Sequence, residues 1–387
     1  MTTELSPNDA SRLAFTVYTV NNGSEKDLKA FLNDKLFNHS TSNKNLLKAE
    51  VGGRAFRATK DAFGVCAFGA GAHQGDLFLI FRGTTTANNN ADFVTDARIG
   101  IAFSKTGLPV HTGFNHTFNS MLPQIRSFLA ENKITGRVHC IGHSLGGAVA
   151  SLAADWIAKN TRLPTKLYTF GAPRVGTEWF ASATSSTLGH NNFYRVYHET
   201  DPVTMVALYP FMHAPYRQAG YYIHSTEPLY PGAAHKMEKY SGNVRGKSWK
   251  QLAATPIQPY DIESAVEAWL KSKSPVNTSS ASFWRWANAA FIYVFKKLAM
   301  HTLVSLQSPL IGLFTLADKI AYILIKGIDL ADNVSIWVER LMRKLMSALG
   351  MKVAKSKKEL TRDLIRQVLI RVTQKANSDA RSALKNL

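Results

Sequence analysis

A serine flanked by glycines is the clearest chemical feature of this sequence. Residues 142–146 read Gly-His-Ser-Leu-Gly, between an apolar run and a run of small residues. Such a Gly-x-Ser-x-Gly turn between a strand and a helix presents its serine hydroxyl on a strained backbone, and the glycines let neighbouring chain approach. We therefore predict that Ser144 is a nucleophile, and that the N–H of Leu145 at the helix N-terminus stabilises an oxyanion.

A serine hydroxyl needs a base, and that base needs an acid to orient it. After a nucleophile in this kind of turn, the acid and then the histidine follow along the chain. The favoured acid is Asp201, just after a predicted strand, and Glu199 competes with it. The candidate bases are His213, His224 and His235. The loop position of His235 favours it over His224, which ends a strand-like run, but the residues alone leave the choice open.

The elements that must position these side chains follow from the alternation of apolar runs and helical patterns. Strands are predicted at 64–69, 77–81, 138–142, 166–170, 193–197 and 221–223, and helices at 114–132 and 146–158. Strands that alternate with helices indicate an α/β domain around a largely parallel sheet. We predict that this catalytic domain covers residues 1–270.

The rest of the chain, residues 271–387, has a different composition. A Ser-, Asn- and Pro-rich stretch at 272–282 is the predicted linker, and only helical patterns follow, the last with a capping box at 356–359. This region holds 20 of the 46 Lys and Arg residues but 7 of the 27 Asp and Glu, which is +13 of the net +19. Its aromatic and basic residues suit an anionic membrane surface. We predict a basic helical region that either packs on the catalytic domain or associates with a membrane, and we expect no nucleic-acid partner because no motif for one is present.

Six motifs in order resemble the class 3 lipases, the fungal-type members of the α/β-hydrolases. They are Phe81-Arg82-Gly83-Thr84, Val110-His111-Thr112-Gly113-Phe114, Gly142-His143-Ser144-Leu145-Gly146-Gly147, Thr169-Phe170-Gly171-Ala172-Pro173-Arg174-Val175-Gly176, Asp201-Pro202-Val203 and His235-Lys236-Met237-Glu238-Lys239-Tyr240. The resemblance implies an α/β-hydrolase fold, a second oxyanion donor at Thr84, His235 as the base, and a mobile lid between Thr85 and Leu108. The segment from Asp201 to His235 is shorter than in the secreted fungal lipases, which leaves the acyl-chain preference open.

The expected reaction is hydrolysis of acyl esters of membrane glycerolipids through an acyl-enzyme on Ser144, and the strongly basic chain favours phospholipids. The alternatives are a triacylglycerol lipase or carboxylesterase, and a membrane-permeabilising protein whose helical region is the active part. No metal or organic cofactor is expected. Both cysteines, Cys66 and Cys140, lie in apolar runs, and we predict that they are free buried thiols.

The first residues lack the basic leader and apolar segment of a secretory signal peptide. We expect synthesis in the cytoplasm and, where the protein is exported, a leaderless route. Together with the lipase motifs and the basic appendage, this resembles bacterial lipase effectors delivered by contractile (type VI-like) secretion systems. The resemblance implies a lipid membrane as target, a cognate immunity protein, and a secretion-apparatus or chaperone partner.

Overall fold

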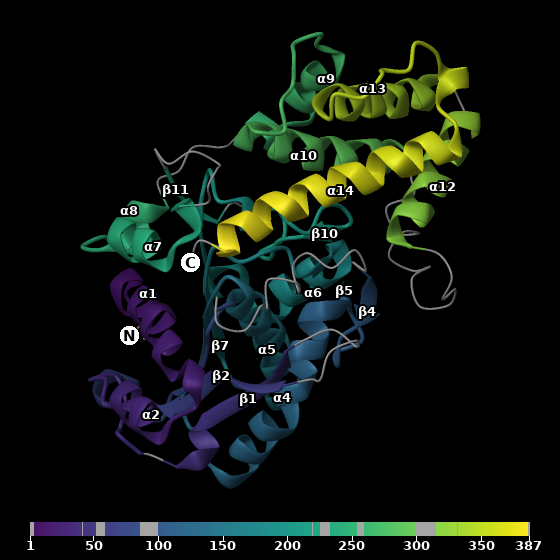
Figure 1. The fold of residues 1–387 in the computed structure, drawn as a ribbon. Coiled ribbons are helices and arrows are strands. Elements are labelled where there is room, and N and C mark those ends of the chain that lie inside the picture. The colour runs from purple at the N-terminus through teal and green to yellow at the C-terminus, as the bar shows by residue number, and fades with distance from the viewer. Residues whose placement is uncertain are drawn as a thin grey trace.

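The computed structural model describes residues 4–40, 42–51, 59–85, 100–218, 220–224, 233–253, 259–298, 315–330 and 332–385. A seven-stranded sheet with the order β1-β2-β3-β6-β7-β9-β11 forms the centre of the first part of the chain (Figure 1). Its strands are β1 (Leu46–Val51), β2 (Thr59–Phe68), β3 (Leu77–Phe81), β6 (Val138–His143), β7 (Thr165–Phe170), β9 (Phe193–His198) and β11 (Tyr221–Ile223). From β3 to β11 the neighbours are parallel, and β1 and β2 extend the edge in antiparallel pairing.

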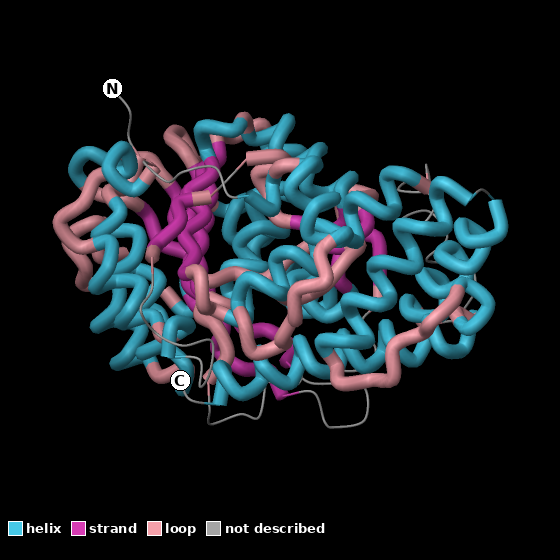
Figure 2. The backbone as a smooth tube through the Cα atoms, turned by 90° about the horizontal axis from the view of Figure 1, so that it is seen from above, coloured by secondary structure: helices cyan, strands magenta, loops and turns pink. Residues whose placement is uncertain are grey.

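Both faces of this sheet are buried, as the continuous apolar sequence of β3 requires. Leu77, Leu79 and Phe81 point into one apolar core, and Phe78 and Ile80 point into the other. The first face is covered by α4 (Thr112–Glu131), α5 (Leu145–Thr161) and α6 (Glu178–Leu188). The second is covered by α1 (Pro7–Thr16), α2 (Glu25–Leu32), α7 (Met237–Val244) and α8 (Trp249–Leu252). Helices therefore lie on both sides of the sheet (Figure 2).

A second, smaller sheet lies beside α4 and α6. Its four short strands have the order β10-β8-β5-β4, and they are β4 (Ile101–Phe103), β5 (Pro109–His111), β8 (Gly176–Thr177) and β10 (Phe211–Met212). All of its pairs are antiparallel. Sequence reasoning did not predict this sheet, whose strands are only two or three residues long.

The last third of the chain is helical and packs against the rest. Its helices are α9 (Glu263–Lys271), α10 (Ala281–Lys297), α12 (Leu316–Leu330), α13 (Asp332–Ala348) and α14 (Arg362–Lys385). The long α14 runs back from α12 toward the carboxyl edge of the central sheet (Figure 1). There it contacts the 3-10 turns η6 (Pro202–Met205) and η7 (Ala233–His235). The rings of Phe291 and Phe295 on α10 stack on Tyr209, with centroids 6.2 and 4.5 Å apart, and continue the apolar core into these helices.

The predicted fold class is confirmed: an α/β-hydrolase with a mostly parallel central sheet is followed by helices alone. The stretch predicted as a linker connects two helices that pack on each other, since residues 272–280 join α9 to α10. By its contacts, α9 lies with the helices that follow, although all but its last residue belongs to residues 1–270. The predicted start of the last helix is wrong. Ser356 precedes a short 3-10 turn, and α14 begins after Thr361, whose hydroxyl accepts the N–H of Leu364.

Candidate active site

Ser144 occupies the sharp turn between β6 and α5 at the carboxyl edge of the sheet. Its backbone has φ of +56° and ψ of −128°, a conformation that a non-glycine residue adopts only under strain. A Cβ on Gly142 would lie 2.2 Å from the carbonyl oxygen of Gly146, and a Cβ on Gly146 would lie 2.2 Å from that of Phe81. Both flanking glycines are therefore sterically required, which is the physical content of the Gly-x-Ser-x-Gly pattern.

His235 links Ser144 to Asp201 through both of its ring nitrogens. Its Nε2 lies 2.8 Å from Ser144 Oγ, and its Nδ1 lies 2.8 Å from Asp201 Oδ2. Burial alone would raise the pKa of Asp201, but the charge and hydrogen bond of His235 and the donors Tyr240 and Val203 hold it below its ordinary value. An ionised carboxylate only accepts hydrogen bonds, so Nδ1 carries the proton and Nε2 accepts from the serine hydroxyl. All three side chains are 0% exposed.

The carboxylate of Asp201 is fixed from several sides. It precedes η6 and accepts the N–H of Val203 on Oδ1 at 2.9 Å, while the phenol of Tyr240 donates to Oδ2 at 2.6 Å. The Tyr240 hydroxyl in turn accepts the N–H of His198 at 3.2 Å. Gly171, with φ of +56°, leaves no room for a side chain here, since a Cβ would lie 2.7 Å from Asp201 Oδ2. Sequence reasoning gave Tyr240 no role, although it ends the motif that begins at His235.

His143 and Tyr18 hold the backbone of the candidate base. His143 Nε2 lies 2.8 Å from the carbonyl oxygen of His235, and its Nδ1 lies 2.7 Å from the hydroxyl of Tyr18. Complete burial lowers the pKa of His143 to about 3, so the ring is neutral, donates from Nε2 and accepts at Nδ1. Tyr18 lies in the 3-10 helix η1 (Val17–Asn22), 125 positions before His143, and no local sequence pattern predicts this contact.

The competing candidates lie elsewhere and do not contact Ser144. Glu199 accepts the hydroxyl of Tyr222 at 2.6 Å and lies 3.7 Å from His224, whose side chain is 75% exposed. His213 is directed to the carbonyl oxygen of Thr204, 2.9 Å from its Nε2. Among the described residues, the structure therefore brings Asp201 and His235 to the serine and places Glu199, His213 and His224 outside that arrangement.

The two predicted oxyanion donors flank the serine. Leu145 is the first residue of α5, where backbone N–H groups have no acceptor within the helix. Gly83, just before Thr84, packs on the turn, since a Cβ there would lie 2.9 Å from Ser144 Cβ. Thr84 is buried and follows directly on the end of β3. The predicted lid between Thr85 and Leu108 falls largely on residues 86–99, which lie outside the described part of the chain.

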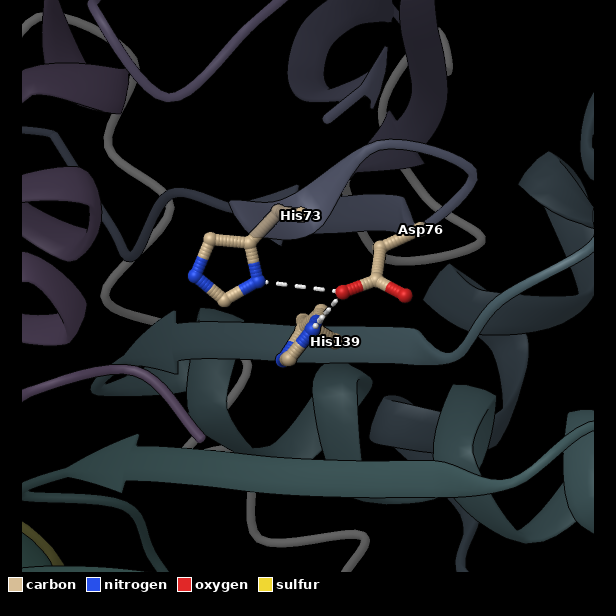
Figure 3. Close-up of side chains that lie close together, drawn as sticks. All are labelled: His73, Asp76 and His139. Carbon is tan, nitrogen blue, oxygen red and sulfur yellow. Dashed lines mark hydrogen bonds and ion pairs between the residues drawn. The ribbon is translucent and has the colours of Figure 1, made fainter. Parts of the chain in front are cut away.

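A second polar cluster lies at the opposite edge of the sheet, before β3 and at the start of β6 (Figure 3). His73 Nδ1 and His139 Nε2 each lie 3.0 Å from Asp76 Oδ2, and Oδ1 accepts the N–H of Arg137 at 2.7 Å. Within the described residues it is the only group of three close enough to hold a metal ion. Hydrogen bonds satisfy both carboxylate oxygens, so the arrangement acts as a polar clamp between two parallel strands. Sequence spacing did not indicate it.

Sheet order, the strained turn and the serine–histidine–carboxylate arrangement are those of the α/β-hydrolase fold. Comparison with known proteins extends this. Residues 78–211 match the model of the family "Lipase (class 3)", so the resemblance inferred from the motifs is confirmed. The lipase of Rhizopus niveus is 30% identical over 203 residues, 50% of this chain and 45% of that protein. The secreted mono- and diacylglycerol lipase 1 of Fusarium solani is 40% identical over 100 residues, 25% of this chain and 29% of that protein.

A third relative differs in kind. Toxin TseL of Vibrio cholerae is 37% identical over 87 residues, 22% of this chain and 13% of that protein. The chain thus spans less than half of the length of each of these three relatives. Among solved structures, the lipase of Rhizopus microsporus var. chinensis aligns with a TM-score of 0.40 and 24% identity, over 57% of this chain and 73% of that one. No helix in the described part of the chain has the length and apolar character needed to cross a bilayer.

Proposed function

We propose that the chain hydrolyses acyl esters of glycerolipids, with Ser144 as nucleophile, His235 as general base and acid, and Asp201 as the group that orients the imidazole. The observation that carries this is the pair of 2.8 Å contacts that join the three side chains. Ser144 Oγ attacks the ester carbonyl carbon while its proton passes to His235 Nε2. The imidazolium then protonates the departing alcohol oxygen, and water, deprotonated in the same way, releases the fatty acid.

The backbone N–H groups of Thr84 and Leu145 hold the oxyanion of each tetrahedral intermediate in this proposal. The position of Leu145 at the start of α5 supports its part, because the partial positive charge of the helix N-terminus acts at the same point. The packing of Gly83 on the serine supports the part of Thr84. Because the three reacting side chains are buried, the proposal includes a movement that uncovers them before substrate binds.

Membrane phospholipids are the proposed substrates, cleaved in the manner of a phospholipase A. The net charge of +19, concentrated in the helical region, supports an anionic lipid surface as the partner. The matched lipases of Rhizopus and Fusarium support acylglycerols as the second candidate. The match to a bacterial toxin supports a role as a secreted antibacterial enzyme, neutralised in the producing cell by an immunity protein.

Mass spectrometry of lipids released from vesicles of mixed phospholipid and triacylglycerol tests the proposal. Wild type is compared with Ser144→Ala and with Ser151→Ala, a control that removes a buried hydroxyl two turns along α5, bonded to the carbonyl oxygen of Gly147. We expect lysophospholipid and free fatty acid from wild type and Ser151→Ala, and none from Ser144→Ala. Diacylglycerol without lysophospholipid identifies an acylglycerol lipase instead. Full hydrolysis by Ser144→Ala contradicts the mechanism.

The biological role is tested separately by periplasmic expression in a bacterium. The proposed role predicts growth arrest with wild type and normal growth with Ser144→Ala. Arrest that persists with Ser144→Ala would assign the toxicity to the helical region as a membrane-permeabilising segment. Normal growth with active wild type in the periplasm would contradict an antibacterial role.

A further inference from the structure

A cavity with a volume of about 900 Å³ lies between the α/β domain and the helices α9 and α10. On the hydrolase side it is lined by residues of α6, β9, η6 and the segment from β10 to residue 218, and on the other side by residues of α9, α10 and the turn before α9. None of the three proposed catalytic residues (Ser144, His235 and Asp201, called the relay below) lines this cavity. The cavity, named here the interface cavity, is thus a separate space whose two walls come from distant parts of the chain.

Four arginines line the interface cavity; Arg217 is exposed, and the other three are buried or partly buried. Arg174 and Arg195 come from the hydrolase, and Arg285 comes from α10. Arg174 is 7% exposed, and burial together with the charges of Arg195 and Arg285 lowers its pKa to about 9. Burial and the charges of Arg195, Arg174 and Arg285 hold the pKa of His213 well below its ordinary value. The imidazole of His213, which also lines the cavity, is therefore neutral. Two of the guanidiniums share a neighbour: the Cζ atoms of Arg195 and Arg285 lie 4.3 and 5.4 Å from the centroid of the Tyr197 ring.

None of these three arginines belongs to an ion pair in the described part of the chain. Burial lowers the pKa of Arg285, but Tyr260, Tyr197 and the charge of Glu199 raise it by more, so this guanidinium has a partial counter-charge nearby. Arg174 donates to the carbonyl oxygen of Ala207 at 3.0 Å, and Arg285 donates to the hydroxyl of Tyr260 at 2.7 Å and to the carbonyl oxygen of Glu199 at 2.6 Å. The Nε atoms of Arg195 and Arg285 are buried without a partner among the described residues.

Three acidic residues also line the interface cavity: Glu178, Asp261 and Glu263. Glu263 pairs with Lys296, and Glu178 accepts the hydroxyl of Tyr216. The third, Asp261, has an interaction of its own. Buried cations without a counter-charge are costly, and the usual solutions are a paired carboxylate or a bound anion. A bound anion would supply the direct pairing that no carboxylate of the described residues gives these three guanidiniums.

We propose that the interface cavity binds a phosphate group, held between Arg174 and Arg195 on one wall and Arg285 on the other. Guanidinium forks match the oxygen pairs of phosphate, and unpaired buried N–H groups give such a site its affinity. The volume exceeds that of one phosphate, and part of the lining is apolar, with Met205, Met212 and Ile292. A phosphate on an amphiphile, such as an anionic phospholipid headgroup, fits this lining, and free phosphate shares the same chemistry. The proposal is independent of the one for Ser144.

Binding is tested by calorimetric titration of the full chain with inorganic phosphate and, separately, with dioctanoyl phosphatidic acid below its critical micelle concentration. We expect saturable binding, weakened about tenfold or more in Arg195→Gln and in Arg285→Gln, since each removes a charge-assisted contact. Arg126→Gln, which alters an exposed arginine on α4, should bind as wild type does. Tighter binding of the lipid identifies a headgroup site, and equal binding identifies a site for phosphate itself.

A second measurement on wild type does not depend on the folding of any variant. Phenylglyoxal modifies accessible arginines, and peptide mapping reports each site. We expect saturating phosphate to protect Arg195 and Arg285 and to leave Arg126 unprotected. Absence of saturable binding of both probes, equal affinity of wild type and the two cavity variants, or equal labelling of all sites with and without phosphate would each overturn the proposal.

Discussion

Replacing Tyr240 by Phe removes one hydroxyl that serves two buried partners. The hydroxyl donates to Asp201 Oδ2 at 2.6 Å and accepts the N–H of His198 at 3.2 Å, and Tyr240 is 0% exposed. A hydrogen bond to a charged group contributes about 1.5–3 kcal/mol. If about 1.5 kcal/mol of this acts in the transition state, where Asp201 faces the imidazolium of His235, kcat falls about tenfold. KM should not change, because Tyr240 lies behind the carboxylate.

The same change lowers the free energy of unfolding. The N–H of His198 loses its acceptor in a buried position, and the two losses together predict about 2–4 kcal/mol at neutral pH. The pKa of Asp201 is lower in the folded chain than in the unfolded chain. The stability that the ionised carboxylate gives to the fold is therefore complete at pH values above the unfolded-state pKa, and it is lost as pH falls through the folded-state pKa. The difference between wild type and Tyr240→Phe should therefore shrink in acid.

The assay is hydrolysis of a soluble short-chain nitrophenyl ester, with urea unfolding measured between neutral pH and pH 3. Tyr168→Phe is the matched control: Tyr168 is also 0% exposed, and its hydroxyl accepts the N–H of Leu5 at 3.1 Å, on a contact outside the relay. It should lose stability and keep its kcat. A kcat of Tyr240→Phe within twofold of wild type would refute the assignment of Tyr240 as a positioning residue.

Three further predictions concern other buried groups. Gly171→Ala should lower both kcat and stability because its Cβ would meet the carboxylate of the relay, whereas Gly246→Ala, also at positive φ but in open space, should cost about 1 kcal/mol and leave kcat unchanged. Asp76→Asn should destabilise the fold by about 1–2 kcal/mol at neutral pH in urea unfolding. Burial raises the pKa of the Asp76 carboxyl, but hydrogen bonds with His139, His73 and a backbone N–H lower it by more. The loss of stability in Asp76→Asn should therefore fade as pH falls through the pKa of Asp76 in the folded chain, and a loss that does not depend on pH would contradict this. Burial also raises the pKa of both thiols, Cys66 and Cys140, so an aromatic disulfide reagent should label neither until the chain is unfolded.

The sequence predicted correctly those features that depend on residues close together in the chain. The turn at Ser144 follows from two glycines between an apolar strand and a small-residue helix, and β3 and β11 have the bounds that their apolar runs indicated. The free, buried state of both cysteines is confirmed as well. The order of residues along the chain narrowed the choice of acid and base to a few candidates. Only the fold shows that Asp201 and His235 lie at the serine.

Contacts between distant segments could not be predicted in this way. Such contacts depend on how elements pack in three dimensions, and sequence periodicity does not encode that. Examples are the hydrogen bond between Tyr18 and His143, the hydrogen bond from Tyr240 to Asp201, and the contacts of α14 with η6 and η7. The basic character of the last helices was visible in the sequence. The sequence did not show that Arg285, on α10, lines the same cavity as arginines from the first part of the chain.

The central claim is that Ser144 carries the acyl group, and covalent trapping tests it most directly. Intact-protein mass spectrometry after reaction with a long-chain alkyl fluorophosphonate, followed by peptide mapping, reports which hydroxyl is modified. The account predicts a single adduct on Ser144 in wild type, greatly slowed in His235→Ala and absent in Ser144→Ala. Ester hydrolysis that is blocked by an adduct on any other residue would contradict it.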